Sequence, residues 1–317
     1  MSARQLNVAV LMGGPSAEAE VSRVSAAEVA RALETAGHKP TLIELDTQVT
    51  SEVLQLAPDV VFPALHGPPG EDGTVQGFLE ILGLPYVGSD VRGSAAAMDK
   101  SLAKSVFQRA GLPVLDDLLV RTDQAPARIA ETIFAAFGER VVLKPLGQGS
   151  AIGVTRVIGN MDLEQAVRSA IASQPRERAL LVEPFVDGRE VTVGVLDLHG
   201  SEPRAFPVIE ITTAEDEWYD YTNRYDPAKS QHLIPAPLGA ETSEWLQSIA
   251  LDAHSGLGLR DLSRADYLVA NDDVYLLEVN SLPGMTPTSL YPDGARAIGM
   301  DFPTLLEALV ESAYQRG

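Results

Sequence analysis

The sequence predicts a multidomain α/β and α+β protein, in which an N-terminal parallel-sheet domain precedes two α+β domains. The chain has 317 residues, 45% of them hydrophobic, which is more than one typical domain needs to bury a core. Up to residue 98, short apolar runs alternate with helical patterns. Beyond that residue, β-type runs are joined by loops rich in glycine and serine, so the fold class is expected to change there.

The first domain is expected to span residues 1–98. Its opening run at 7–14 is typical of a buried parallel strand, and Ser16 is expected to cap the helix that follows. Alternating strands and helices of this kind predict a parallel sheet. The further elements are predicted as strands at 40–46, 59–67 and 84–88, with a helix over 73–83.

The middle domain is expected to span residues 99–188. Its first helix ends at Gly111 and is followed by Pro113, a usual pair of helix-stop signals. The further elements are predicted as a helix at 126–138, two β-type runs within 140–157, a helix at 161–173, and two antiparallel strands that turn at 187–188.

The last domain is expected to span residues 189–317. Alternating apolar residues on both sides of Asn271 and Asp272 predict a β-hairpin that turns there, over 263–279. The further elements are predicted as strands near 189–196 and 205–212, a polar loop at 214–232, a helix at 242–257, and terminal helices.

The composition excludes several classes of protein. The formal net charge is −20, with 44 acidic residues against 24 lysines and arginines, which opposes general attraction to nucleic acid or anionic membranes. The chain has no cysteine, which rules out disulfides, thiolate metal sites and a cysteine nucleophile. The N-terminal apolar run is too short for the hydrophobic region of a signal peptide, and no run approaches the length of a membrane-spanning helix. We therefore expect a soluble cytoplasmic protein with no nucleic-acid or membrane partner.

Polar side chains gather in the predicted C-terminal hairpin. Glu278 and Asn280 are two residues apart on one strand and share a face, as do Arg264 and Asp266 on its partner. Pairing in register about the turn would bring the three oxygen-bearing side chains together beside the arginine. Such donors predict a Mg²⁺ site next to phosphate. A solvated hairpin face with a salt bridge is the alternative.

Any nucleotide must be bound without a Walker loop, because the sequence contains no Gly-Lys dipeptide. Lys144 ends a predicted strand and precedes the loop 146–153, whose backbone N–H groups can close over phosphate oxygens. Lys100 is a second candidate cation. Taken alone, these features are more typical of a surface lysine and an ordinary loop.

The stretch at 180–190 offers a strand edge for adenine. Backbone groups at Phe185 and Val186 can pair with the base, while the carboxylates of Glu183 and Glu190 would meet its amino group and the ribose. An ordinary hairpin is the alternative interpretation of this stretch.

A series of sequence blocks runs in order from one end of the chain to the other. The series resembles the D-alanine–D-alanine ligase family, whose members have the ATP-grasp fold, with two α+β domains that sandwich ATP behind a parallel-sheet domain. The complete series is far more specific than any one block. The blocks are GGPSAEAEVS (13–22), LHGPPGEDG (65–73), GLPYVGS (83–89), AMDKSLAK (97–104), KPLGQGSAIGVTRV (144–157), YDYTNRY (219–225), SRADYLV (263–269) and LLEVNSLPGMTPTSL (276–290).

The resemblance implies an ATP-dependent ligase that joins two D-alanines for bacterial peptidoglycan synthesis. The first D-alanine carboxylate would attack the γ-phosphate of ATP to give D-alanyl phosphate, and the second D-alanine amine would displace phosphate. Glu278 would bridge two Mg²⁺ or Mn²⁺ ions, with Asp266 on one and Asn280 on the other. Arg264 and the backbone N–H of Gly284 would form an oxyanion hole.

The same resemblance implies the substrate contacts. Glu18 would hold the ammonium of the first D-alanine, and His66 would lie beside that substrate. Ser289 and Leu290 would bind the carboxylate of the second D-alanine.

A network of Glu18, Ser150 and Tyr225 is also implied, and it would join the loops at 147–153 and 219–225. Closing these loops would keep water from the acyl phosphate.

Three residues depart from the family pattern, in which Lys, Ser and Thr usually stand at positions 224, 151 and 281. Arg224 would still meet the γ-phosphate, but as a planar fork rather than a point charge. Ala151 and Ser281 leave the expected metal ligands in place. We therefore expect activity to be retained with altered kinetics.

Alternative products stay open at this stage. The family also contains ligases that join D-alanine to D-lactate or D-serine, but Tyr225 accompanies the dipeptide product. A phosphotransferase that stops at the phosphorylated product and a non-catalytic nucleotide-binding protein are further alternatives. A homodimer is expected, because dimers are usual in the family.

Overall fold

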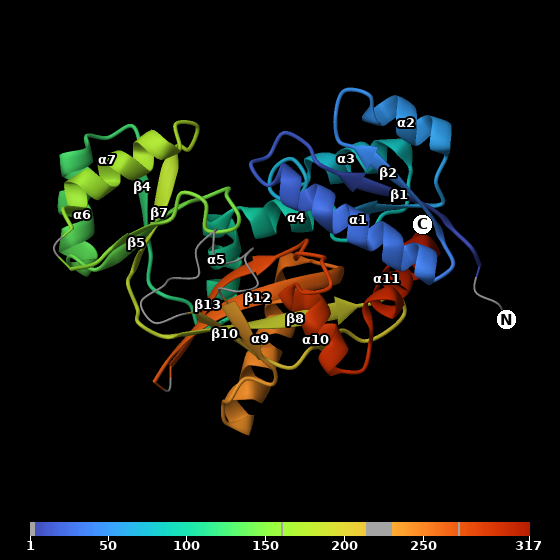
Figure 1. The fold of residues 1–317 in the computed structure, drawn as a ribbon. Helices are drawn as coiled ribbons and strands as arrows, with labels where there is room; N and C mark the ends of the chain where they lie inside the picture. Colours follow the sequence, from blue (N-terminus) through green and yellow to red (C-terminus); the bar gives the residue numbers. More distant parts are fainter. Residues whose placement is uncertain (1–3, 160, 214–229, 272) are drawn as a thin grey trace.

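The computed structural model of the protein describes residues 4–159, 161–213, 230–271 and 273–317. Its elements form three groups, seen in Figure 1 as a blue part, a green part and a part coloured yellow to red. Among the described residues, no helix is long and apolar enough to cross a membrane.

The N-terminal group contains the predicted parallel sheet. Strand β1 (Asn7–Met12) lies between β2 (Lys39–Glu44) and β3 (Val60–Pro63). Val8 and Val10 pack with the helices on one face, while Ala9 and Leu11 pack with those on the other. Both faces of the sheet are therefore covered, which explains the continuous apolar sequence of β1. The helices of this group are α1 (Ala19–Thr35), α2 (Val49–Leu56), α3 (Thr74–Leu82) and α4 (Val91–Met98).

Two predictions for this group were wrong. The strand expected at 84–88 is reduced to a single bridge between Val61 and Tyr86. Ser16 does not cap α1: its hydroxyl donates to the backbone carbonyl of His66 at 2.7 Å, and the helix begins only after Glu18. Helices α2 and α4 were not predicted.

The central group is an antiparallel sheet in the order β4-β7-β5-β6. Its two helices pack side by side on the sheet (Figure 1), and together they enclose a core of their own. Its elements are β4 (Leu118–Arg121), α6 (Pro126–Phe137), β5 (Val141–Pro145), β6 (Thr155–Val157), α7 (Leu163–Ser173) and β7 (Ala179–Pro184).

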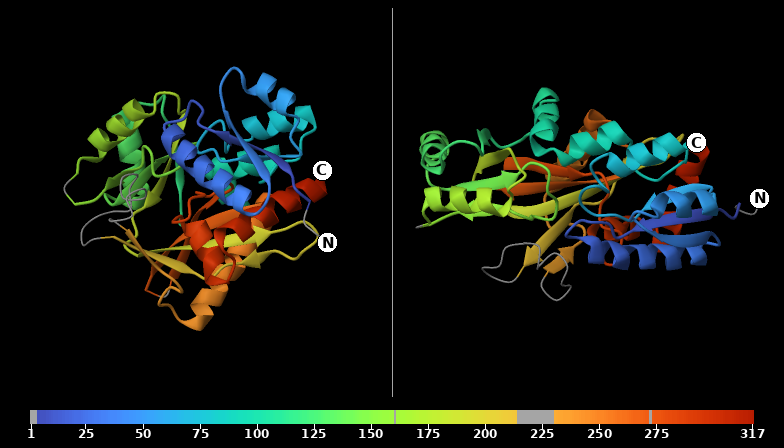
Figure 2. Two further views of the ribbon diagram at one scale, coloured as in Figure 1. Left: turned by 45° about the vertical axis from the view of Figure 1, so that its right-hand side comes forward. Right: turned by 90° about the horizontal axis from the view of Figure 1, so that it is seen from above.

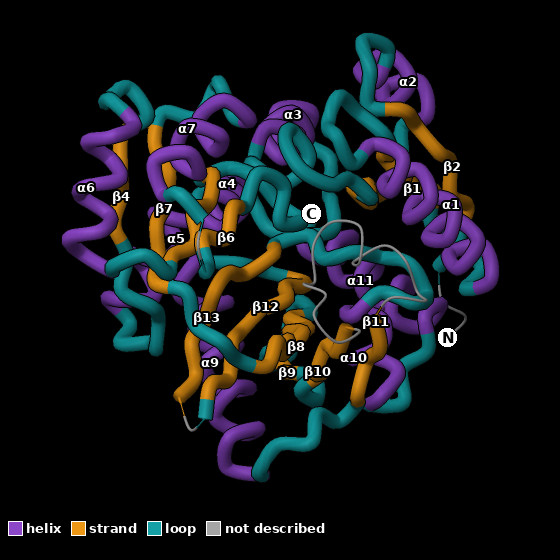
Figure 3. The backbone as a smooth tube through the Cα atoms, turned by 60° about the vertical axis from the view of Figure 1, so that its left-hand side comes forward, coloured by secondary structure: helices purple, strands orange, loops and turns teal. Residues whose placement is uncertain are grey.

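The C-terminal group contains a six-stranded sheet in the order β11-β10-β8-β12-β13, with β9 beside β8; Figure 3 shows these strands in turn. Helices α5 and α9 pack on one face of this sheet. The elements are α5 (Lys100–Arg109), β8 (Arg189–Asp197), β9 (Arg204–Ala205), β10 (Ile209–Thr213), β11 (Ser230–Leu233), α9 (Ala240–Leu257), β12 (Asp261–Ala270), β13 (Asp273–Asn280), α10 (Leu290–Ala297) and α11 (Phe302–Arg316).

The hairpin predicted around 187–188 does not form. Strand β7 already has β4 and β5 as neighbours, and β8 lies between β10 and β12 in the other sheet. The segment between them therefore passes from the central to the C-terminal group.

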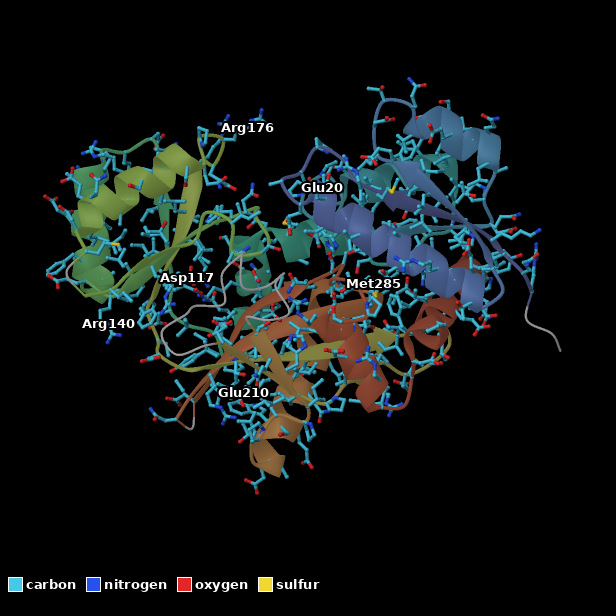
Figure 4. The ribbon with its side chains drawn as sticks, in the orientation of Figure 1. Glu20, Asp117, Arg140, Arg176, Glu210 and Met285 are labelled. Carbon is cyan, nitrogen blue, oxygen red and sulfur yellow. The ribbon has the colours of Figure 1, made fainter. Side chains whose placement is uncertain are left out.

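The N-terminal and C-terminal groups share a hydrophobic core. Leu305 and Leu309 of α11 pack in the same cluster as Val8 and Val10 of β1. Figure 2 shows the red helix α11 against the blue strands. Met285, labelled in Figure 4, belongs to the same cluster. These two groups are therefore joined more closely to each other than either is to the central group, whose core is separate.

Candidate active site

The hairpin of β12 and β13 contains a one-residue shift in register. Near the turn, Ala270 pairs with Asp273 and Tyr267 with Leu276, but the next pair is Asp266 with Glu278. Leu277 is therefore an extra residue, as in a β-bulge. Without it, the plain register used in the sequence prediction would have placed Asp266 opposite Leu277, and Glu278 on the other face.

Asp266 is held by three neighbouring side chains. Arg264 donates to both of its carboxylate oxygens, at 2.9 and 2.8 Å. Thr192 on β8 donates at 2.6 Å, and the side-chain amide of Asn280 donates at 3.0 Å. These contacts fix the orientation of Asp266 and turn the amide nitrogen of Asn280 toward it.

The donor set fits a hard divalent cation. Asp266 and Glu278 offer carboxylate oxygens and Asn280 an amide oxygen, which are ligands that Mg²⁺ and Mn²⁺ prefer. In the described part of the chain, no group of three or more His, Cys, Asp or Glu side chains has a metal-binding arrangement. The metal hypothesis therefore depends on two carboxylates and an amide.

A cavity of about 330 Å³ lies between the central and C-terminal sheets. Its wall contains many of the residues predicted to bind nucleotide. The ring of Phe185 is flanked by two guanidinium groups, of Arg140 at 5.0 Å and Arg156 at 4.7 Å. The predicted residues in this wall are Lys100, Lys144, Glu183, Phe185, Val186, Glu190, Arg264, Asp266 and Glu278.

The carboxylate of Glu183 is engaged by lysines from two elements. Lys144 on β5 lies 2.5 Å from it, and Lys104 on α5 contacts its other oxygen. Burial alone would raise the pKa of Glu183, but the two ammonium groups bring the pKa below its ordinary value. Lys104 also lies 3.5 Å from Asp117, which Figure 4 labels.

Lys104 was missed in the sequence because it lies outside any recognisable phosphate motif. Its position three residues before Phe107, on the buried face of an amphipathic helix, was the available signal. Lys100 faces the cavity instead and lies 3.3 Å from Glu278, while also donating to the Gln148 carbonyl at 2.6 Å.

A second cavity, of about 810 Å³, lies between the N-terminal and C-terminal groups. It brings together residues from four separate parts of the sequence, as the substrate predictions require. The predicted residues in its wall are Glu18, His66, Ser150, Arg264, Asn280, Gly284, Ser289 and Leu290.

Ser150 closes this cavity on one side by donating to Glu18 at 2.5 Å. Ser150 and Ala151 both have positive φ, 49° and 57°, which is a strained backbone for residues with a Cβ. His66 contacts Ser25 through Nε2 at 3.1 Å. Burial lowers the pKa of His66 despite the nearby Glu18, so its ring is neutral at pH 7.

Ser289 and Leu290 lie at the N-terminus of α10, where the helix dipole favours a carboxylate. The Ser289 hydroxyl accepts from the backbone N–H of Thr286 at 3.1 Å. Gly284 is close enough that an added Cβ would lie 3.2 Å from this hydroxyl. A glycine there leaves room for a ligand beside the backbone.

Glu71 is a further residue of the second cavity, and the sequence analysis gave it no role. Its carboxylate accepts from the backbone N–H of Gly67 at 2.7 Å. Burial and the neighbouring Glu18 raise the pKa of Glu71 to about 8. Its place in the block LHGPPGEDG was visible, but its cavity position depends on how that loop folds. Arg224 and Tyr225 lie outside the described residues.

Comparison with known proteins agrees with this architecture. The family model described as "D-ala D-ala ligase C-terminus" matches residues 106–311, and that described as "D-ala D-ala ligase N-terminus" matches residues 47–89. A relative named D-alanine–D-alanine ligase from Desulforudis audaxviator (strain MP104C) is 43% identical over 309 residues, covering 98% of this chain and 99% of the relative. One from Moorella thermoacetica is 41% identical over 314 residues, covering 98% and 100%.

Solved structures give the same result. The D-alanine–D-alanine ligase from Coxiella burnetii superimposes with a TM-score of 0.82 at 28% identity, covering 99% of this chain and 95% of that one. The Bacillus anthracis ligase complexed with ATP gives a TM-score of 0.80 at 27% identity, covering 98% of each chain. The fold and the cavity between two antiparallel sheets therefore define an ATP-grasp protein. The chain belongs to the D-alanine–D-alanine ligase family.

Proposed function

We propose that this chain is an ATP-dependent ligase that joins two D-alanines into D-alanyl-D-alanine through a D-alanyl phosphate. The observation that supports it most directly is the position of Arg264, which lies in the wall of both cavities. A phosphate group from the first cavity and a substrate carboxylate from the second can therefore meet beside one guanidinium. Arg264 and the backbone N–H of Gly284 would stabilise the oxyanion of the tetrahedral intermediate.

The nucleotide would lie in the first cavity. Lys100 and Lys144 would bind its phosphates, and the backbone at Phe185 and Val186 would contact adenine. The carboxylate of Glu183 is committed to lysines, which favours a role in holding Lys144 rather than in reading the base.

Asp266, Glu278 and Asn280 would hold two Mg²⁺ or Mn²⁺ ions, with Glu278 shared between them. When bound, the ions would neutralise the charge that moves between phosphate and carboxylate. Arg264 and Thr192 would keep Asp266 oriented toward them.

Two ends of the second cavity would bind the two amino acids. Glu18 and His66 would hold the first, and Ser289 and Leu290 the carboxylate of the second. The contact between Ser150 and Glu18 supports closure of the phosphate loop over the substrate, which keeps water from the acyl phosphate. Tyr225 would complete this closure, and Arg224 would meet the γ-phosphate.

The family resemblance supports a cytoplasmic homodimer that supplies dipeptide for peptidoglycan. Light scattering during size-exclusion chromatography would determine the oligomeric state.

The activity is tested by a coupled ATPase assay with mass spectrometry of the products. D-alanine, D-lactate, D-serine and L-alanine are each supplied with ATP and Mg²⁺. From D-alanine alone we expect ADP and D-alanyl-D-alanine. When D-lactate or D-serine is added to D-alanine, we expect little product other than D-alanyl-D-alanine. ADP release without a joined product would instead identify a phosphotransferase.

A further inference from the structure

The proposed reaction places two ammonium groups in the second cavity, one from each D-alanine. Glu18 is the partner proposed for the first. The second ammonium must be held near the acyl phosphate and must also lose a proton, because a protonated amine has no electron pair with which to attack. The following inference rests on the proposed function and concerns this proton.

Glu71 lies at a position where its carboxylate could bind the second ammonium. It faces the large cavity that also contains Arg264 and Gly284, and a small space that it shares with Lys100 and Glu278. Glu71 therefore lies between the second cavity, proposed for the amino acids, and the residues proposed to bind phosphate and metal.

The carboxylates of Glu18 and Glu71 converge beside Gly149 of the phosphate loop. A Cβ added to Gly149 would lie 3.7 Å from the Glu18 carboxylate and 3.8 Å from that of Glu71. Gly67 holds one of the two, because its backbone N–H donates to Glu71 at 2.7 Å. This end of the cavity thus offers two neighbouring carboxylates, one for each ammonium group of the substrates.

We propose that Glu71 is a further catalytic residue, which binds the ammonium of the second D-alanine and accepts its proton. The N–H bond breaks and its electron pair stays on nitrogen, while the proton forms an O–H bond on Glu71. The amine then attacks the acyl carbon, phosphate leaves with the electrons of the C–O bond, and the second proton of the nitrogen passes to the departing phosphate. The proton on Glu71 returns to solvent after the product departs.

The surroundings of Glu71 suit a proton acceptor at neutral pH. Burial and Glu18 raise the pKa of Glu71 to about 8, Gly67 and Arg264 oppose this, and Glu278 adds to it. A base works best when its pKa is near the working pH, and the positive charge of the substrate ammonium favours the ionised carboxylate of Glu71 once the substrate is bound. The charged or titratable groups that face Glu71 are Glu18 at the start of α1, Lys100 on α5, His66 in the preceding loop, Arg264 on β12 and Glu278 on β13.

His66 is the other candidate proton acceptor in this wall, but its position is less suitable. Burial lowers the pKa of His66, and the positive charge of Arg264 opposes its protonation further. Its Nε2 is also paired with Ser25 at 3.1 Å.

The test compares two nucleophiles in the full chain with ATP, Mg²⁺ and D-alanine. Hydroxylamine is already neutral at pH 7, so it can trap the acyl phosphate as D-alanyl hydroxamate without a base. Glu71→Gln retains an oxygen that can accept from Gly67. We expect this variant to lose about 10²–10⁴-fold in dipeptide formation, while hydroxamate formation stays within about twofold of the unaltered chain. The pH dependence of kcat/KM for D-alanine should also lose one ionisation.

The control is Glu34→Gln, which removes the same charge from an exposed position on α1 and should change neither product. Unchanged dipeptide formation by a folded Glu71→Gln variant would overturn the assignment. Equal loss of dipeptide and hydroxamate would also overturn it, because the first step would then need Glu71. If the unaltered chain makes no dipeptide, the proposed function fails as well, and this result is separate from a failure of Glu71 alone.

Discussion

Asp266 and Glu278 lie directly opposite each other on neighbouring strands, although a plain hairpin register would put them on opposite faces of the sheet. The extra residue Leu277 produces this pairing. Two carboxylates in such a position repel each other unless cations lie between or beside them, which is the charge arrangement a divalent metal relieves.

Glu278→Gln should therefore weaken metal binding while preserving the fold. Removing the shared carboxylate should reduce turnover on the order of 10³-fold, since metal ions contribute several kcal/mol of charge stabilisation. Mn²⁺ titration followed by electron paramagnetic resonance measures the binding directly. Asp273→Asn, at the exposed start of the same strand, is the matched control. Normal Mn²⁺ affinity in the Gln variant would remove Glu278 from the metal site.

Arg264→Met should reduce turnover by about 10²–10³-fold, the usual cost of one lost oxyanion donor. The affinity for ATP should change little, because the predicted adenine contacts lie on other elements. Arg121→Met is a matched control, because Arg121 at the exposed end of β4 also pairs with a carboxylate two residues further along, that of Asp123. A purely structural role for Arg264 would lower the melting temperature and preserve turnover per folded molecule.

Ser150→Ala should loosen the loop that Ser150 ties to Glu18. Hydrogen bonds to charged groups contribute about 1.5–3 kcal/mol, so closure should weaken roughly 10- to 100-fold. The ratio of ADP to dipeptide should rise as water reaches the acyl phosphate, and amide hydrogen exchange in the ATP-bound protein should increase over 147–153. Ser169→Ala, exposed on α7, is the control. An unchanged ratio and unchanged exchange would count against closure by this contact.

Lys104→Met should lower both stability and nucleotide affinity. Breaking one side of a buried ion pair costs about 3–5 kcal/mol, and Glu183 would then be free to draw Lys144 out of the cavity. Urea unfolding and calorimetric ATP binding measure the two effects separately. Lys104→Arg should recover much of the affinity, whereas Lys39→Met at an exposed position should change neither quantity. Wild-type ATP affinity in a folded Met variant would show that Lys104 does not position Lys144.

Glu71 should make the unliganded protein less stable as the pH rises. The folded protein holds a proton on Glu71 up to about pH 8, whereas the unfolded chain loses it near the ordinary pKa of 4.5. The stabilisation is therefore complete below pH 4.5 and is lost as the pH rises through 8. In urea unfolding between pH 5 and 9, Glu71→Gln should show a smaller decline than the unaltered chain or Glu34→Gln. Equal declines in all three would contradict the raised pKa.

Much of the fold could be predicted because the spacing of apolar residues within one helix or strand shows which of its faces is buried. The apolar run of β1 and the alternation in β12 each follow from the side chains within one strand. Pairing partners could not be read in the same way. The sequence suggests a hairpin around 187–188, but which sheet accepts β8 depends on strands far away in the chain.

The predictions for the site were likewise limited to what nearby residues in the sequence can show. Asp266, Glu278 and Asn280 were found from their spacing and from family blocks, yet the bulge at Leu277 that aligns them could not be inferred from alternation alone. Lys104 and Glu71 were missed because their roles depend on contacts with distant residues. Neither residue type is unusual at its position in the sequence.

The core shared by β1 and α11 has a consequence for synthesis on the ribosome. Val8 and Val10 are made early and are followed by α1, which packs on them, but Leu305 and Leu309, which complete the same cluster, are made almost last. The central group encloses its own core and can fold as soon as β7 has emerged. Until α11 is made, the nascent chain therefore has a partly exposed apolar surface on its N-terminal group while the central group is already folded. Such a surface favours aggregation and can bind chaperones.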